Sequence, residues 1–286
     1  MKRTETLPKD ENGTAAGRKG EVVLRIASGL VLAALALAAT LYSPWSFLPL
    51  VVVGGGLAIW EWGKLTRGNG FDGTALISAV TVAAVAVLTS LWRPDLATLI
   101  LASASAVIFV TQPARRQSAW SVAGLLYIAL PAAALVWLRG DEALGAIAVV
   151  YLFAVAWTTD TASYAAGRLI GGPKLAPRIS PGKTWSGFII GALTPALVGI
   201  AFALALKSTS PLRLALVSVA LALACQAGDL TESWVKRRFG AKDMSQMIPG
   251  HGGLLDRIDG LLFAAVLVAL IGLSDLANPG HGLLIW

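Results

Sequence analysis

The residues best suited to chemistry are concentrated between Asp229 and Asp259, a stretch of 31 residues with ten charged side chains. Five are acidic and five are basic, about a third of the stretch, against 14% charged residues in the whole chain. If the stretch begins as a helix, Asp229, Glu232 and Lys236 recur along one face. Such a mixed cluster suits a Mg²⁺–polyphosphate complex, because Mg²⁺ takes one or two carboxylates while bases bind the phosphate oxygens.

A second polar group begins at Asp160. Asp160, Tyr164 and Arg168 recur every four residues, which places them on one face if the segment is helical. Two turn-rich segments, 179–184 and 249–253, contain Pro and Gly and can bring backbone N–H groups near an anion. Together these features predict one anion-binding site assembled from separate parts of the chain.

The composition of the 286-residue chain indicates a membrane protein. Apolar types make up 56% of the residues and the mean hydropathy is +0.71, whereas a soluble domain has about a quarter charged residues. Disorder and nucleic-acid binding are excluded despite a pI near 9.8, because the basic residues are not spread over a polar surface. The single cysteine, Cys225, can form neither an internal disulfide nor a cysteine-based zinc site.

Long apolar runs predict an all-α polytopic integral membrane protein, since a bilayer core about 30 Å thick requires about 20 apolar residues of helix. Nine runs follow this pattern, and two of them are short. The predicted spans are 22–43, 46–62, 75–92, 95–111, 119–138, 142–159, 184–206, 211–228 and 260–274.

The distribution of Lys and Arg predicts the orientation of these spans. With the N-terminus in the cytoplasm, 19 of the 23 Lys and Arg residues fall on the cytoplasmic side. The opposite side then holds Arg93, Arg139, Lys207 and Arg213. We therefore predict a multi-pass protein of the cell (inner or plasma) membrane whose N-terminus and polar site face the cytoplasm. Its C-terminus is expected on the opposite side.

Residues 1–21 form a polar segment of mixed charge that we expect to be a flexible cytoplasmic tail. Residues 22–286 are expected to form a single membrane domain, with its catalytic region at about 160–187 and 229–260. Cleavage of the first span as a signal peptide near 36–38 is an alternative. The length and acidic residues of the leader argue against it.

The charged residues also allow a simpler interpretation, in which they lie at the membrane surface and pair with each other or with lipid headgroups. Arg237 and Arg238 suit that interpretation, since juxtamembrane bases commonly bind anionic lipid. Asp229 and Asp256 do not, because a carboxylate at a span end requires a counter-cation. We therefore interpret these two carboxylates as candidate metal ligands.

The segment that ends at Asp259 also resembles a family signature. It reads Ser233-x-Val235-Lys236-Arg237, then Lys242-Asp243-x-Ser245, then Ile248-Pro249-x-His251-Gly252-Gly253-Leu254-x-Asp256-Arg257-Ile258-Asp259. This resembles the pattern of phosphatidate cytidylyltransferases, also called CDP-diacylglycerol synthases, and meets all its specified positions across 27 residues.

A second stretch is similar to the same family. It reads Asp160-Thr161-x-x-Tyr164-x-x-Gly167-Arg168, followed by Ile179-Ser180-Pro181-x-Lys183-Thr184-Trp185-x-Gly187. Gly182 and Ser186 depart from the pattern, since many members carry Lys and Glu there, so no role is carried over at these two positions. The resemblance covers roughly the C-terminal half of the chain.

The resemblance implies a reaction at the cytoplasmic face, in which phosphatidate and CTP give CDP-diacylglycerol and pyrophosphate. It implies Mg²⁺ as cofactor, held by Asp229 and Asp256, and leaves a second cation open. It further implies contact with membrane lipid and a homodimer.

The phosphate of phosphatidate is already an anion, so this reaction requires positioning and charge neutralisation more than a strong base. Catalytic roles are expected for Asp229, Lys236, Asp243, Asp256, Arg257 and Asp259. Substrate contacts are expected from Asp160, Arg168, Ser180, Lys183, Thr184, Ser233, Lys242 and His251.

Several of these residues fit a second role equally well. Asp243 and Asp259 can ligate metal or orient neighbouring bases. Ser180 and Thr184 also suit an ordinary turn and helix N-cap, and His251 can either bind phosphate or shape its turn. Glu61, at the cytoplasmic end of the second span, suits either a substrate contact or an interfacial anchor.

Two rival functions fit parts of the pattern. A CTP-dependent polyprenol kinase, which resembles this family distantly, would transfer the γ-phosphate, but the complete signature argues against it. A transporter would place ionisable groups near the bilayer midplane, often in repeated halves. The carboxylates here lie at span ends and no repeat is apparent, so transport is disfavoured.

Overall fold

The computed structural model describes residues 15–112, 114–207, 210–247 and 252–285, with backbone only for 15–26. Almost all of this part of the chain is helical, which confirms the predicted all-α class. The helices are α1 (Ala15–Tyr42), α2 (Pro44–Arg67), α3 (Gly73–Ser90), α4 (Pro94–Thr111), α5 (Arg115–Arg139), α6 (Gly145–Leu169), α7 (Trp185–Leu193), α8 (Ala196–Leu206), α9 (Pro211–Arg238), α10 (Leu255–Gly272) and α11 (Pro279–Leu284). The strands are β1 (Lys174–Ala176) and β2 (Ser180–Thr184).

Seven helical stretches in the described residues are long and apolar enough to cross a bilayer, namely α2 to α6, α7 together with α8, and α9. A multi-pass membrane protein is therefore confirmed. The apolar part of α1 that is described covers only 27–42, and α10 carries three charged residues in its first turns. The total of nine spans and their orientation stay predictions.

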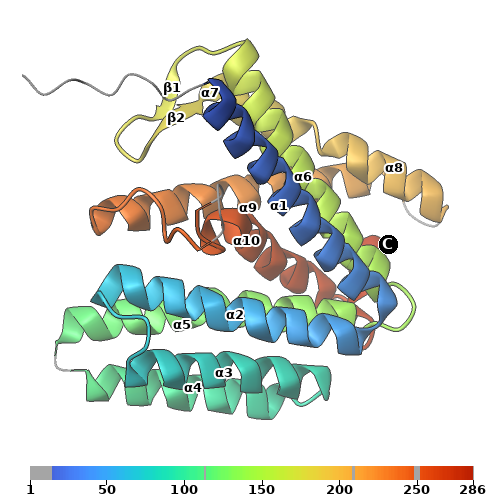
Figure 1. Ribbon diagram of the computed structural model, residues 1–286. Helices are drawn as coiled ribbons and strands as arrows, with labels where there is room; N and C mark the ends of the chain where they lie inside the picture. Colours follow the sequence, from blue (N-terminus) through green and yellow to red (C-terminus); the bar gives the residue numbers. More distant parts are fainter. Residues whose placement is uncertain (1–14, 113, 208–209, 248–251, 286) are drawn as a thin grey trace, which may run out of the picture.

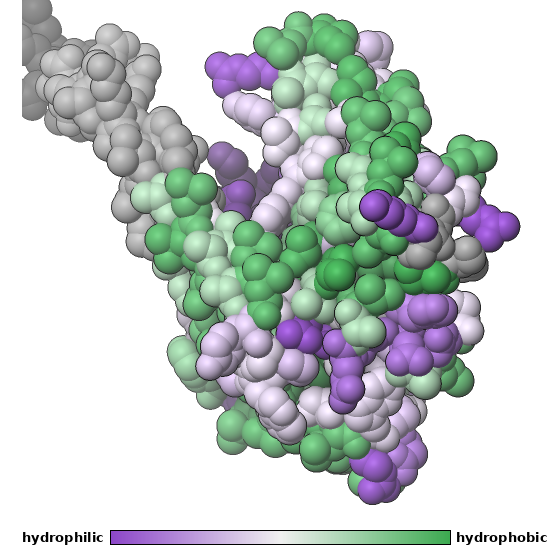
Figure 2. All heavy atoms as spheres, turned by 90° about the vertical axis from the view of Figure 1, so that its right-hand side faces the viewer, coloured by the Kyte–Doolittle hydropathy of each residue, from purple (hydrophilic) through white to green (hydrophobic). Residues whose placement is uncertain are grey.

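The surface agrees with a membrane setting. Figure 2 shows hydrophobic residues over much of one face, with hydrophilic residues confined to separate patches. Large apolar side chains are exposed on several helices, including Leu76 of α3, Val110 of α4 and Leu197 of α8. Lipid tails would solvate such side chains, so their exposure needs no protein partner.

Helix boundaries depart from the predicted spans in ways that the local sequence explains. The span 184–206 is divided into α7 and α8 around Pro195, which lacks the N–H that a continuous helix needs. Helix α9 extends ten residues beyond the predicted 211–228, as the spacing of its charged residues indicated. Helix α1 begins at Ala15, inside the segment 1–21 that we expected to be a tail, and residues 1–14 lie outside the described residues.

A short antiparallel hairpin, absent from the sequence prediction, links α6 to α7. Strand β1 pairs with β2, with Lys174 opposite Thr184 and Ala176 opposite Ser180. Gly171 and Gly172 precede β1 with φ of +67° and +105°, which turns the chain sharply after α6. In Figure 1 the hairpin lies at the end of α6, outside the main bundle.

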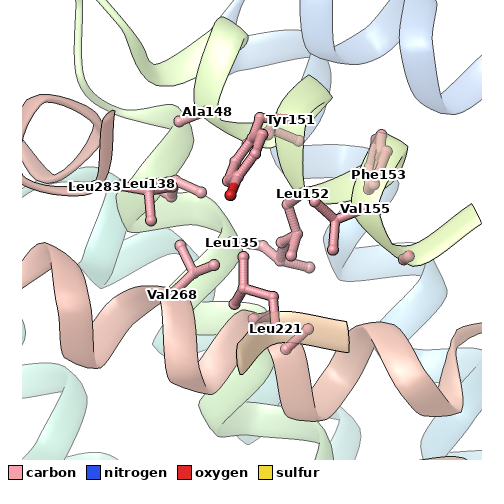
Figure 3. Close-up of a cluster of buried hydrophobic side chains, with 14 of the residues drawn as sticks. Leu135, Leu138, Ala148, Tyr151, Leu152, Phe153, Val155, Leu221, Val268 and Leu283 are labelled. Atoms are coloured by element: carbon pink, nitrogen blue, oxygen red, sulfur yellow. The ribbon is translucent and has the colours of Figure 1, made fainter. Parts of the chain in front are cut away.

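The helices form a bundle with two differently oriented parts. Figure 1 shows α2, α3, α4 and α5 side by side, with α9 and α10 next to them and α1 and α6 crossing obliquely. The largest core lies where α5, α6, α9 and α10 meet. Leu135, Leu152, Leu221 and Val268 point toward one another there (Figure 3). The nearby hydroxyl of Tyr151 is 2.7 Å from Ser218 Oγ, so this buried polar group is satisfied.

Buried polar contacts hold one end of the bundle together. Arg139 Nε donates to the carbonyl of Thr40 at 2.6 Å, which joins α5 to the end of α1. Asp141 Oδ2 accepts the backbone N–H groups of Gly280 and His281 at 3.0 and 3.1 Å. These contacts attach the C-terminal α11 to the turn between α5 and α6, at the end of the bundle away from the candidate site.

Close packing of α9 on α10 depends on small residues, as is common between membrane helices. A Cβ atom on Gly228 would lie 2.4 Å from the carbonyl oxygen of Asp259. A Cβ atom on Gly260 would lie 3.0 Å from the carbonyl oxygen of Cys225. The two glycines therefore allow the two helices that carry most of the acidic residues to lie against each other.

We expect Gly228→Ala to separate α9 from α10 and to destabilise the protein by about 1–3 kcal/mol, the usual cost of overpacking. Thermal unfolding in detergent measures this loss. Gly56→Ala is the matched control, because a Cβ atom at Gly56 meets nothing within 4 Å and Ala favours helix. Equal stability of the two variants would contradict the close crossing.

Candidate active site

One cavity of about 960 Å³ brings together the two regions that the sequence singled out. It lies between α1, α2, α5, α6, the hairpin, α7, α9 and α10. Ten of the predicted site residues line it: Asp160, Arg168, Lys183, Thr184, Asp229, Lys236, Asp243, Asp256, Arg257 and Asp259. The prediction that residues near 160–187 and 229–260 share one site agrees with this geometry.

The other four predicted residues have different positions. Ser233 does not line the cavity, but its hydroxyl donates to Asp229 Oδ1 at 3.5 Å. Lys242 lines a second cavity of about 380 Å³ with Lys64. Ser180 begins β2 and lines neither cavity, so the structure does not bring it to the site. His251 lies outside the described residues.

Lys236 joins the two helices that supply the acidic residues. Its Nζ is 2.6 Å from Glu232 Oε2, one turn earlier on α9, and 2.6 Å from Asp256 Oδ1 on α10. The side chains of Glu232 and Asp256 are only 1% and 6% exposed. Ion pairs this deeply buried are sensitive, because removing one partner leaves an uncompensated charge.

Asp256 is held on both oxygens. While Oδ1 contacts Lys236, Oδ2 accepts the backbone N–H groups of Met244 at 3.0 Å and Gly253 at 2.8 Å. Backbone N–H groups from both described parts of the α9–α10 loop, 239–247 and 252–254, therefore bind this carboxylate. Asp259 lies one turn further along α10, and its Oδ1 accepts the N–H of Gly260 at 2.8 Å.

The hairpin brings a second lysine to the cavity. Lys183 Nζ is 2.7 Å from Asp229 Oδ2, with both side chains partly exposed. Thr184 then begins α7, because its Oγ1 accepts the N–H of Gly187 at 3.1 Å. Thr184 thus has the N-cap role that the sequence allowed, while still lining the cavity.

Two arginines near this region make side-chain contacts, and Arg168 lines the cavity itself. Arg168 Nη1 donates to the hydroxyl of Tyr164 at 2.8 Å, as their spacing along α6 indicated. Arg237 Nε donates to the carbonyl of Ile179 at 3.2 Å and so ties α9 to the hairpin loop. The sequence interpretation of Arg237 as a lipid anchor missed this contact, which joins segments 58 residues apart.

Two acidic residues near the site were not among the predicted site residues: Glu232, and Glu61, for which the sequence left a substrate contact and an interfacial anchor open. Glu232 lines the cavity, and its spacing of four residues from Lys236 was the available signal. Glu61 is fully buried and bonds only to groups of the C-terminal half among the described residues. In the sequence, only the presence of a single carboxylate in the apolar run 46–62 indicated that Glu61 has a role.

The residues of the cavity fit a bound Mg²⁺. Asp229 and Asp256 line the same space, and an ionised carboxylate has about four acceptor positions, not all of which are used in either residue. Within the described residues, no three His, Cys, Asp or Glu side chains are grouped closely enough to hold a metal ion. A two-carboxylate site still suits Mg²⁺ that retains water and phosphate ligands.

Comparison with known proteins decides the family. A sequence profile of the cytidylyltransferase family matches residues 23–274. The chain belongs to this family. The match extends well beyond the C-terminal half on which the signature lies, and it confirms the predicted resemblance.

Named relatives within the cytidylyltransferase family agree with this assignment. The phosphatidate cytidylyltransferase of Brucella suis biovar 1 (strain 1330) is 40% identical over 249 residues, 87% of this chain and 92% of that protein. That of Rickettsia conorii (strain ATCC VR-613 / Malish 7) is 29% identical over 279 residues, 95% of this chain and 97% of that protein. That of Haemophilus influenzae (strain ATCC 51907 / DSM 11121 / KW20 / Rd) is 46% identical over 127 residues, 42% of this chain and 43% of that protein.

We expect Lys236→Met to destabilise the protein by about 3 kcal/mol, because two buried carboxylates lose their shared cation. The double variant Glu232→Gln, Lys236→Met should recover much of this loss, since one of the two charges is then removed. Thermal unfolding of the wild type, both single variants and the double variant forms a double-mutant cycle. Strictly additive effects would contradict the coupling of Lys236 to Glu232.

Proposed function

We propose that this member of the cytidylyltransferase family transfers the cytidylyl group of CTP to phosphatidate, giving CDP-diacylglycerol and pyrophosphate for phospholipid synthesis. The observation that carries the proposal is a single cavity with both charged and apolar walls. The charged wall holds the residues described above. The apolar wall includes side chains of four helices: Leu32, Ala33 and Ala36 of α1, Phe47, Leu50 and Val51 of α2, Ile128, Ala132 and Leu135 of α5, and Phe153 and Trp157 of α6.

An amphiphilic substrate suits this combination. The acyl chains of a phospholipid would lie along the apolar wall, and its phosphate would reach the charged wall. A soluble polyanion such as CTP would use the charged wall alone. Because both substrates are anionic, the bases Lys183 and Arg257 are the groups that would allow their phosphates to approach each other.

In the proposed reaction, a phosphate oxygen of phosphatidate forms a bond to the α-phosphorus of CTP. The bond from that phosphorus to the oxygen bridging to the β-phosphate breaks, and pyrophosphate leaves with the bonding electrons. No general base is required, since the attacking phosphate is already ionised. The protein would contribute orientation and positive charge, as is general for phosphoryl-type transfer.

Named residues would divide this work. Asp229 and Asp256 would hold Mg²⁺, which when bound supplies positive charge to the phosphate oxygens of CTP. Lys183 has a long, flexible side chain and can exchange Asp229 for a phosphate oxygen. Lys236, fixed between two carboxylates, would orient Asp256.

The setting of the reaction is part of the proposal. We place the protein in the cell (inner) membrane with this cavity toward the cytoplasm, because 19 of the 23 Lys and Arg residues fall on that side of the predicted topology. Contact with membrane lipid, a homodimer and a second cation are included as well. The dimer and the second cation rest on family resemblance alone.

A labelled-CTP assay on purified protein with phosphatidate tests the proposal. We expect label from the α-phosphate to enter the lipid with Mg²⁺ and to fall to background with excess EDTA. Entry of γ-phosphate label into phosphatidate or a polyprenol would instead establish a kinase. If neither label moves into lipid, the enzymatic proposal fails.

Two variants are measured in the same labelled-CTP assay. Asp256→Asn should reduce transfer to background, because the proposed metal site loses a charged ligand. Arg93→Gln should retain wild-type transfer, because Arg93 is exposed and pairs only with Asp95 among the described residues. Normal turnover by Asp256→Asn would remove this residue from the mechanism.

We expect Ala33→Trp to raise the KM for phosphatidate several-fold while leaving the KM for CTP unchanged, because the indole would fill the apolar part of the cavity. Ala34→Trp is the matched control, since Ala34 is exposed and does not line the cavity. Steady-state kinetics in mixed micelles separate the two constants. Equal effects at both positions would show that the acyl chains bind elsewhere.

A further inference from the structure

The carboxylate of Glu61 joins the two halves of the protein. Glu61 lies near the end of α2, and its side chain is 0% exposed. Its Oε1 accepts the hydroxyl of Ser245 at 2.5 Å and the N–H of Leu254 at 2.9 Å, while Oε2 accepts the N–H of Leu255 at 2.8 Å. No described Lys or Arg pairs with it. All three partners lie close to the start of α10.

These bonds replace a local helix cap. The first N–H groups of a helix have no intrahelical partner, and a polar side chain commonly accepts their hydrogen bonds. A carboxylate is favoured in this role because the N-terminal end of the helix dipole is positive. Helix α10 begins at Leu255, and the preceding Leu254 provides no side-chain cap. Glu61 therefore caps α10 from another helix, 193 and 194 residues away in sequence.

The described parts of the same loop also donate to Asp256, the proposed metal ligand. Asp256 Oδ2 accepts N–H groups from Met244 and Gly253, which directly precede Ser245 and Leu254, two of the residues that donate to Glu61. A Cβ atom on Gly253 would lie 2.6 Å from Glu61 Oε1 and 3.0 Å from Asp256 Oδ2. Gly253 thus lies between the two carboxylates, and a side chain there would push them apart.

A direct role of Glu61 toward substrate does not agree with this geometry. Its oxygens are occupied by three donors, and it lines neither the 960 Å³ cavity nor the 380 Å³ cavity. Both alternatives considered from the sequence, a substrate contact and an interfacial anchor, are therefore replaced by a buried structural contact.

We propose that Glu61 is a positioning residue for Asp256: by holding the start of α10 and the loop before it, Glu61 sets where the Asp256 carboxylate stands in the cavity. This inference rests on the proposed function for its catalytic consequence, although the cap itself does not. Outer contacts that orient a metal ligand commonly contribute 10–100-fold to activity or metal affinity.

Glu61→Gln is the informative variant. It preserves the side-chain volume. One carboxylate oxygen becomes an NH₂ group, however, and that group then faces a backbone N–H of Leu254 or Leu255, so a hydrogen bond is replaced by two opposed donors. We expect kcat to fall by about 10–100-fold and the Mg²⁺ concentration for half-maximal rate to rise. The KM for phosphatidate should change little, because the apolar wall is untouched. Glu142→Gln is the matched control, as Glu142 is exposed in the α5–α6 turn, away from the cavity.

A second measurement does not depend on activity. Hydrogen–deuterium exchange should show faster exchange of the Leu254 and Leu255 amides in Glu61→Gln than in wild type or Glu142→Gln. Unchanged exchange, or unchanged kcat and Mg²⁺ dependence, would overturn the inference. If Glu61→Gln does not fold, Ser245→Ala decides, since it removes one of the three bonds and should lower kcat to a smaller extent. Wild-type kinetics in Ser245→Ala would then overturn it.

The two proposals fail in different ways. If wild-type protein moves no label from CTP to lipid, the proposed function fails while the exchange experiment still tests the cap. If wild type is active and Glu61→Gln behaves like Glu142→Gln, the function stands and the positioning role is wrong.

Discussion

The contact of Lys236 with Glu232 and Asp256 is the interaction on which the polar end of this protein depends. Both carboxylates are almost completely buried, and an unpaired charge in such surroundings would cost several kcal/mol. Helices α9 and α10 must therefore keep the register in which one ammonium reaches both. That register also places Asp229 and Asp259 on the walls of the same cavity.

Glycine makes this register possible. Gly228 and Gly260 let the backbones of α9 and α10 approach closely, and Gly253 leaves room for two carboxylates beside one loop. Gly252 has φ of +85°, a conformation that residues with a Cβ rarely adopt. Gly252 and Gly253 of the signature thus allow the backbone just before α10 to place its N–H donors on two carboxylates. Gly253 donates to Asp256, and Leu254 donates to Glu61.

Other helices of the bundle form the apolar part of the cavity, along which a lipid substrate would bring its phosphate to the charged residues. One wall of the cavity consists of apolar side chains from α1, α2, α5 and α6, and the other carries the charged residues of α6, α9, α10 and the hairpin. A bilayer already solvates acyl chains, so no dedicated lipid-binding domain is needed. Helix α1 contributes to the apolar wall and packs against α2 and α6, and the exposed side chains of Leu30, Val31 and Leu35 give it an apolar outer surface.

Much of this arrangement was predictable from local sequence. The length of the apolar runs predicted the helical membrane class, because bilayer thickness imposes a minimum span. Helical spacing predicted that Asp229, Glu232 and Lys236 share a face, because side chains three to four residues apart are neighbours on any helix. The two stretches that resemble the family contain nine of the ten predicted site residues that line the cavity, and the tenth, Asp229, was singled out by its helical spacing and its position at a span end.

Contacts between distant segments could not be predicted in this way. The cap that Glu61 places on α10 joins residues more than 190 positions apart, and the contact of Arg237 with Ile179 depends on where the hairpin folds. Ser180 matched the family pattern, yet its strand register leaves it outside the cavity. Periodicity reports which side chains share a face, whereas the partner opposite that face is selected only when the helices pack. For that reason the acidic residues were recognisable in the sequence, and the groups that hold them in place became visible only in the tertiary structure.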